Sequence, residues 1–188
     1  MHPIQWVHIN RGCHAGVGGG WATAHGWGVG VGCGRMQLSR GGAAEPASGQ
    51  KGLFDPCKDI PDSVLEEVGL DPATEEAGAA GVEQPGWKIC GWSGSWYFLT
   101  VYSSSYTVDD VRRNPDFRGF EELTVGGRRG IEYQRVDDED NNGCYLAFSV
   151  EHGSIWFNVE RKLSEARQES SCVVVQRLSV NLEPTLPK

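Results

Sequence analysis

The chain has 188 residues, enough for one domain and an additional segment, and it contains no apolar run long enough for a membrane-spanning helix. Acidic residues outnumber basic ones by 25 to 17, and the formal net charge is −8. This charge excludes a general nucleic-acid binder, because phosphate backbones are anionic.

Residues 1–52 differ in composition from the rest of the chain. They hold four of the five His residues and a glycine-rich stretch with neither helical nor strand periodicity. Residues 41–52 (GGAAEPASGQKG) are typical of a flexible linker. We therefore expect residues 1–52 to be largely disordered and residues 53–188 to form the folded domain.

The front segment allows three interpretations. The stretch AGVGGGWATAHGWGVGVGC ends at Cys33, where a bacterial lipoprotein signal would place its lipidation cysteine. Glycine dilutes the apolar region of this signal, so a mis-assigned start or a decayed leader is the alternative. A metal-binding tail is the third interpretation, although its candidate ligands lack zinc-finger spacing. These ligands are His2, His8, Cys13 and His14.

The first half of the domain begins with helix signals. Residues 55–57 (Asp-Pro-Cys) start one helix, because Asp can cap a helix and Pro suits its first position. A second, amphipathic helix covers residues 61–68 and ends at Gly69. The acidic, Ala/Gly-rich residues 71–85 are expected to form a loop.

Strands and two further helices follow. The apolar patterns and turn residues predict strands at 87–92, 96–102, 123–125, 130–136, 144–150 and 154–160. A short helix capped by Thr107 separates the second and third of these strands, and residues 172–182 form a last amphipathic helix. Hairpin spacings require antiparallel pairing. The prediction is an α+β domain with an antiparallel sheet of about five to six strands, covered by its N- and C-terminal helices.

The four cysteines of the domain indicate an oxidising compartment. They contain no C-x-x-C, so a zinc ribbon or a thioredoxin-type motif is not supported. An even number of widely spaced cysteines is typical of disulfides, and four allow three pairings. We prefer the sequential pairing, Cys57–Cys90 and Cys144–Cys172. Four buried free thiols in a cytosolic protein are the alternative.

The domain resembles the actinobacterial lipoproteins grouped as domain of unknown function 3558. The resemblance covers roughly residues 53–187, and its most specific parts are the Asp-Pro-Cys helix start and a Cys-Gly-Trp strand. It implies export and attachment to the outer face of the membrane through a lipidated cysteine, which Cys33 matches loosely. It implies no activity, because the family has none assigned. A Mog1/PsbP-like layering is an expectation from the order of elements alone.

No group of residues predicts catalysis or a cofactor. The domain's one histidine, His152, lies in a predicted turn, and the glycines at 126, 127 and 130 lack the Lys-Ser/Thr of a phosphate loop. Asp138, Asp140 and Asn142 match the opening of a calcium loop, but Ser149 stands where its last ligand should be Glu. A polar turn is therefore the default interpretation of that segment.

Aromatic residues gather in one predicted hairpin and provide the candidate contact residues. These are Trp87, Trp92, Trp96 and Tyr102. Alternation places Trp96 and Tyr102 on one face of the strand and Leu99 on the other, so we expect a central strand covered on both faces. Core packing is one interpretation, and an exposed platform for a sugar, a lipid or a partner protein is the other. The pairs at 112–113 and 128–129 are arginines that are either solvated or grip an anion.

Together these features predict an exported, extracytoplasmic protein without catalysis, a monomer that binds an envelope protein, lipid or glycan. Its contact with a membrane would be limited to the possible lipid anchor. The alternative is a lipid or glycan carrier with a cleft between sheet and helix, and a hydrolase is less favoured. A cavity lined by Trp and Tyr and larger than roughly 300 Å³ would favour the carrier, whereas a flat apolar patch on an edge or face of the sheet would favour the binding domain.

Overall fold

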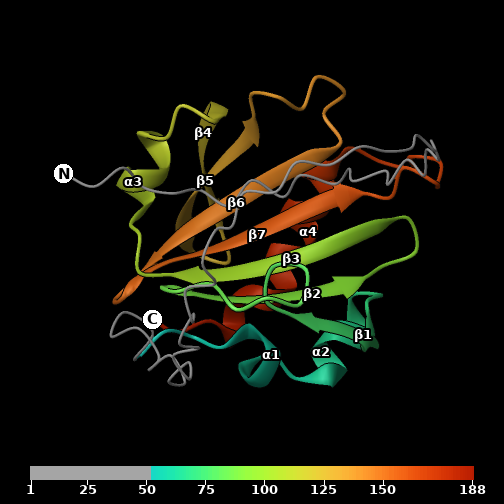
Figure 1. Ribbon diagram of the computed structural model, residues 1–188, viewed down its shortest axis with the longest axis horizontal. Coiled ribbons are helices and arrows are strands. Elements are labelled where there is room, and N and C mark those ends of the chain that lie inside the picture. Colours follow the sequence, from blue (N-terminus) through green and yellow to red (C-terminus); the bar gives the residue numbers. More distant parts are fainter. Residues whose placement is uncertain (1–51) are drawn as a thin grey trace, which may run out of the picture. The chain divides into compact units, whose positions relative to one another are not determined.

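A computed structural model describes residues 52–188 (Figure 1). The predicted disorder of residues 1–52 therefore lies, but for one residue, outside the described part, as does Cys33. The centre is an antiparallel sheet of seven strands in the order β1-β2-β3-β7-β6-β5-β4. The strands are β1 (Asp71–Ala77), β2 (Trp87–Ser93), β3 (Tyr97–Ser104), β4 (Phe117–Val125), β5 (Arg128–Arg135), β6 (Gly143–Val150) and β7 (Gly153–Arg161).

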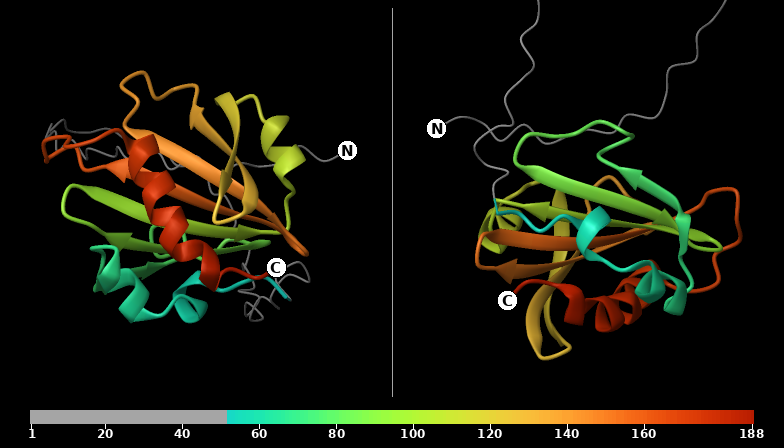
Figure 2. Two further views of the ribbon diagram at one scale, coloured as in Figure 1. Left: turned by 180° about the vertical axis from the view of Figure 1, so that it is seen from behind. Right: turned by 90° about the horizontal axis from the view of Figure 1, so that it is seen from below.

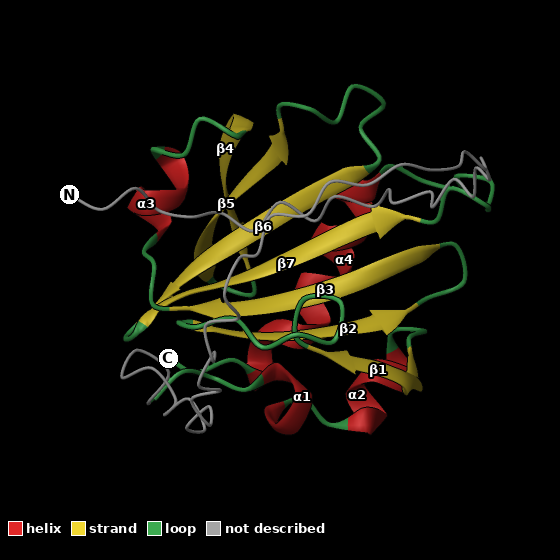
Figure 3. Cartoon of the chain, viewed as in Figure 1, coloured by secondary structure: helices red, strands yellow, loops and turns green. Residues whose placement is uncertain are grey.

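The helices are short, apart from the last one. They are α1 (Pro56–Asp59), α2 (Asp62–Glu67), α3 (Val108–Arg112), α4 (Ser171–Leu182) and the 3-10 turn η1 (Glu183–Thr185). Figure 3 shows how far strands outweigh helices. The antiparallel sheet is confirmed, whereas the α+β class and the expected size of the sheet are met only loosely. Among the described residues, none of the helices has the length and apolarity to cross a bilayer.

One side of the sheet, which we call the helical face, carries the main core. Figure 2 shows α4 lying across this side, and buried residues of α2 and α4 belong to the same apolar cluster as the inward side chains of the strands. Leu99, Leu146 and Phe157 are completely buried there. Their strands pair in register, so these side chains point to the same side. Burial of this apolar surface is the main contribution to the stability of the fold.

The two edge strands are where the prediction was wrong. Residues 71–77, expected in a loop, form β1, and β4 begins at Phe117 rather than at residue 123. Both strands are largely exposed, and each pairs with only one neighbour across an irregular register. An edge strand whose two faces are both exposed to solvent does not require alternating apolar residues. The sequence therefore lacks the pattern by which a strand is recognised.

Candidate functional site

Two disulfides fasten the helical face, and they have the sequential pairing that was expected. Cys57 of α1 is bonded to Cys90 of β2, with the Cα atoms 5.3 Å apart, and Cys144 of β6 is bonded to Cys172 of α4, with a Cα separation of 5.0 Å. Each bond therefore joins a helix to a strand of the sheet. Such bonds persist in oxidising compartments and are rare in the cytosol.

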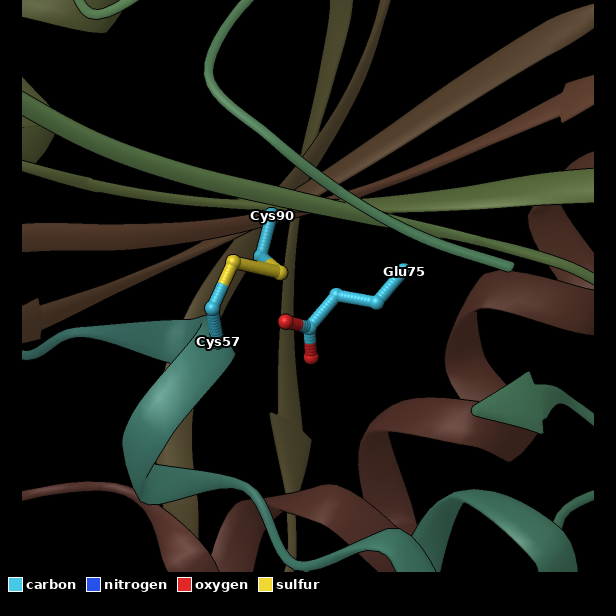
Figure 4. Close-up of side chains that lie close together, drawn as sticks. All are labelled: Cys57, Glu75 and Cys90. Carbon is cyan, nitrogen blue, oxygen red and sulfur yellow. A yellow bond between two sulfur atoms is a disulfide. The ribbon is translucent and has the colours of Figure 1, made fainter. Parts of the chain in front are cut away.

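A carboxylate lies against each disulfide. The carboxyl group of Glu75 is close to the Cys57–Cys90 bond (Figure 4), and Glu132 lies beside the other bond; within each group the ligand atoms are within 4.8 Å of one another. This spacing suits a metal ion. However, the sulfur atoms are bonded to each other, and the thiolate is the form of cysteine that binds metals. The disulfide-bonded protein therefore has no metal site at either position.

The structure divides the four predicted contact residues into two pairs. Trp92 and Trp96 are buried in the main core and are not available to a ligand. Trp87 and Tyr102 are half-buried on the opposite side of the sheet, where their ring centroids are 6.2 Å apart. The expectation that Trp96 shares a face with Tyr102 was wrong. β3 begins at Tyr97, so Trp96 belongs to the preceding turn, where strand alternation does not apply.

The side that carries Trp87 and Tyr102 holds a second cluster of rings, and we call it the aromatic face. Its central ring is that of Trp156, whose centroid is 4.9 Å from that of Trp87 and 6.2 Å from that of Tyr102. The members are Trp87, Tyr102, Tyr106, Phe117, Phe120, Tyr133, Tyr145 and Trp156. Edge-to-face ring pairs of this kind each contribute about 0.5–1.5 kcal/mol beyond their burial.

The expectation that β3 is covered on both faces holds for the helical face only. On the aromatic face, Phe98 is 37 % exposed, and Thr100 and Tyr102 are half-buried. In Figure 2, α4 and α2 lie on the other side of the sheet. The aromatic face therefore presents rings and hydroxyl groups at an accessible part of the central strands.

A row of polar side chains crosses the aromatic face beside the rings. The strand register places Thr100 of β3, Asn158 of β7, Tyr145 of β6 and Tyr133 of β5 next to one another, in that order. Tyr102 lies two positions from Thr100 in β3, so the two side chains are on the same face of the sheet. The hydroxyl group of Tyr133 is buried and has no hydrogen-bond partner. Such an isolated polar group is rare in folded proteins and requires an explanation.

Burial raises the pKa values of three tyrosines, Tyr133 and Tyr145 in this row and Tyr102 beside it. Burial raises the pKa of Tyr102 to about 12, and a smaller contribution comes from the charge of Glu160. Burial also raises the pKa values of Tyr133 and Tyr145 well above the usual value, with smaller contributions from Tyr145 and Tyr102 at Tyr133 and from Tyr102 and Glu160 at Tyr145. Because their pKa values are raised, all three hydroxyl groups are neutral donors at physiological pH.

Raising the pH from 10 to 12 should destabilise the domain. An unfolded Tyr102 ionises near its ordinary pKa of 10.0, whereas the folded residue ionises near 12. Because the fold favours the neutral phenol, its contribution is complete below pH 10 and is lost as the pH rises towards 12. Tyr102 alone should account for a loss on the order of 2 kcal/mol in urea unfolding, and Tyr133 and Tyr145 add to it in the same direction. In Tyr102→Phe the slope should be shallower; an unchanged slope would contradict the assignment.

The turn that resembles a calcium loop is occupied by protein groups instead. Asp138 accepts hydrogen bonds from the backbone nitrogens of Asn142 (2.9 Å) and Gly143 (2.7 Å). Three arginines donate to oxygen atoms of this turn: Arg118, Arg161 and Arg167. Arg161 and Arg167 both donate to Asn142 Oδ1, one of the would-be ligand oxygens, and their positive charges disfavour a bound cation. The geometry therefore fits the polar-turn interpretation better than the calcium interpretation.

Three of the four arginines in the two predicted pairs are engaged with acidic side chains. Arg128 forms an ion pair of 3.0 Å with Glu183, and both side chains are less than one-fifth exposed. Arg112 pairs with Glu122 at 2.8 Å. Arg113 pairs with Asp110, and the pKa of that carboxyl is lowered mainly by its hydrogen bonds to Thr107, which caps α3. These contacts do not favour a site for an anionic ligand.

Two hollows on the described surface lie away from α4. The larger, about 620 Å³, is a shallow hollow lined by residues including Asp71, Thr74 and Lys162. The smaller, about 330 Å³, lies between α1 and β1–β2 and includes Trp87 and Lys88. The space between the sheet and α4 is filled by buried apolar side chains. The geometry therefore favours a binding face over a carrier cleft beneath α4.

Comparison with known proteins shows the family of this chain. The family model described as "Protein of unknown function (DUF3558)" matches residues 11–185, beginning well before the resemblance over residues 53–187. No curated protein and no solved structure matches, so the comparisons add no support for a Mog1/PsbP-like layering. The match spans most of the sequence, and the chain belongs to the DUF3558 family.

Proposed function

We propose that the protein is an exported, non-catalytic binding domain of the actinobacterial cell envelope, and that the aromatic face is its binding surface. The observation that carries the proposal is the second ring cluster on the side of the sheet opposite α4. Rings at an accessible sheet face are typical of binding surfaces, because large flat side chains supply contact area at little entropic cost.

Two further observations support the location. The paired cysteines are compatible with an extracytoplasmic protein, and the resemblance to lipoproteins agrees with attachment by a lipid at Cys33. Export would place the aromatic face towards cell-wall glycans, lipids or other envelope proteins, with a single chain as the binding unit.

The packing argues for binding rather than for catalysis. The domain's one histidine, His152, is exposed in the turn between β6 and β7, whereas a catalytic base is held rigidly beside its nucleophile. The groups that gather on the aromatic face are rings, phenols and an amide, which bind and orient a ligand but do not provide an acid–base pair at neutral pH.

Full-length protein should co-sediment with washed fragments of the cell envelope, and Thr100→Arg should reduce the bound fraction at least tenfold. Thr100 is half-buried between Tyr102 and Asn158, so a guanidinium group there would block the polar row and add an unpaired charge. The measurement is the fraction of protein in the pellet, with thermal unfolding recorded for each variant.

The matched control places the same charge elsewhere. Val180 is 53 % exposed on α4, and Val180→Arg should leave co-sedimentation unchanged. Equal losses in the two variants, or full retention in a folded Thr100→Arg, would remove the aromatic face from the proposed function.

A further inference from the structure

We propose that the ligand of the aromatic face is a neutral carbohydrate, an inference that rests on the proposed function of this face. A pyranose ring has one or two faces of C–H groups and a rim of hydroxyl groups. A complementary protein surface therefore needs aromatic rings beside neutral donors and acceptors, and few unpaired charges.

The rings supply the apolar half of this surface. Tyr102 and Trp87 are half-buried in an edge-to-face pair, and Phe98, also on β3 and directed to the same side, is 37 % exposed. Trp156 lies beneath them and is buried, with its indole nitrogen donating to Ser154 Oγ at 2.6 Å. This arrangement holds the outer rings on a rigid base, so little ordering is required when a ligand packs against them.

The polar row supplies the other half. Thr100 and Tyr145 are half-buried and carry hydroxyl groups that can both donate and accept, and Asn158 lies between them. Tyr133 stacks on Tyr145, with the ring centroids 5.2 Å apart and the planes at 14°. The buried Tyr133 hydroxyl has no partner, and a ligand hydroxyl seated beside Tyr145 would provide one.

The charges near the row argue against ionic ligands. Arg135 is held by both carboxyl oxygens of Asp137, at 2.8 and 2.7 Å, so its guanidinium is already paired. Glu160, the row's acidic neighbour, is exposed at the rim next to Phe98. An acyl chain is also disfavoured, because it would cover the hydroxyl groups of Tyr145 and Thr100 without forming hydrogen bonds to them.

The test is a titration of tryptophan fluorescence in the full-length protein with neutral oligosaccharides. The probes are maltohexaose, cellohexaose, chitohexaose and mannohexaose, and vesicles of phosphatidylcholine serve as the lipid comparison. We expect saturable binding of at least one oligosaccharide, because Trp87 and Trp156 lie at the surface and the base of the site. We expect no saturable change with the vesicles.

Two hydroxyl deletions and one control identify the site. Tyr145→Phe and Tyr133→Phe should each weaken the binding at least fivefold, by removing one hydrogen-bonding group while keeping the ring. Tyr133→Phe should not lower the melting temperature, since it removes a buried hydroxyl without a partner. Tyr97→Phe deletes the hydroxyl group of a buried tyrosine of the helical face and should leave the affinity unchanged.

The inference is overturned if none of the four oligosaccharides binds, if the vesicles alone bind, or if the affinity is the same in Tyr145→Phe, Tyr133→Phe and the wild type. Its failure can be told apart from failure of the proposed function. Envelope co-sedimentation that is lost in Thr100→Arg but is not displaced by any oligosaccharide would keep the binding face and remove the carbohydrate.

Discussion

Replacing Cys57 and Cys90 by alanine should lower the free energy of unfolding by about 3.7 kcal/mol. The bond links residues 33 positions apart, and in the chain-entropy model its loss frees a loop of that length in the unfolded state. The bond between Cys144 and Cys172, with a separation of 28, should contribute about 3.6 kcal/mol. For a domain of this size, each loss corresponds to roughly 10–15 °C in melting temperature.

Urea unfolding of the non-reduced proteins measures the effect. Cys57→Ala alone is the matched control: it should lose nearly as much stability as the double variant, because a single remaining cysteine cannot close the loop. A loss below about 1 kcal/mol in the double variant would show that the unfolded chain keeps this loop closed without the bond.

Gly153→Ala should destabilise the domain by more than about 3 kcal/mol. Gly153 begins β7 with φ at +123°, which L side chains rarely adopt, and an added Cβ would press directly on the backbone oxygen of Ser104. The Cα of Ser105 would lie 2.8 Å from it. These are backbone atoms of the neighbouring segment, so no rotamer change relieves the clash, and the pairing of Ser154 with Ser104 must shift.

Gly127→Ala separates the clash from the cost of the backbone conformation. Gly127 also has a positive φ, +89°, but nothing lies within 4 Å of an added Cβ. That variant should lose only about 1 kcal/mol, the cost of holding alanine in a left-handed conformation. Thermal and urea unfolding of both variants measure the difference, and equal losses would refute the packing argument at Gly153.

The central part of the fold could be predicted because its signals are local. The hairpin strands carry alternating or continuous apolar residues, and Thr107 marks the start of α3, where it forms a capping box with Asp110. β1 and most of β4 were not predicted, because both strands lie at the edges of the sheet and are largely exposed to solvent. Their charged residues face solvent on both sides of the strand and do not alternate with apolar ones. A sequence of that kind is what one expects of a loop.

The candidate site was predictable in part. Trp87 and Trp92 are an odd number of positions apart in one strand, so they had to point to opposite faces, but the sequence did not reveal which face α4 would cover. Tyr133, Tyr145 and Trp156 come from three strands and meet only through the order β7-β6-β5. That order is a property of the whole chain, so no local pattern could have assembled the aromatic face.

The positions of the disulfides have a consequence for the resistance of the domain to proteolysis. The two longest connections without a helix or strand among residues 52–188 are 78–86 and 162–170. The first lies between Cys57 and Cys90, and the second lies between Cys144 and Cys172. A protease that cuts either exposed connection therefore releases no fragment, because the two new ends remain joined through sulfur. The nicked protein keeps every strand attached until a reductant is added.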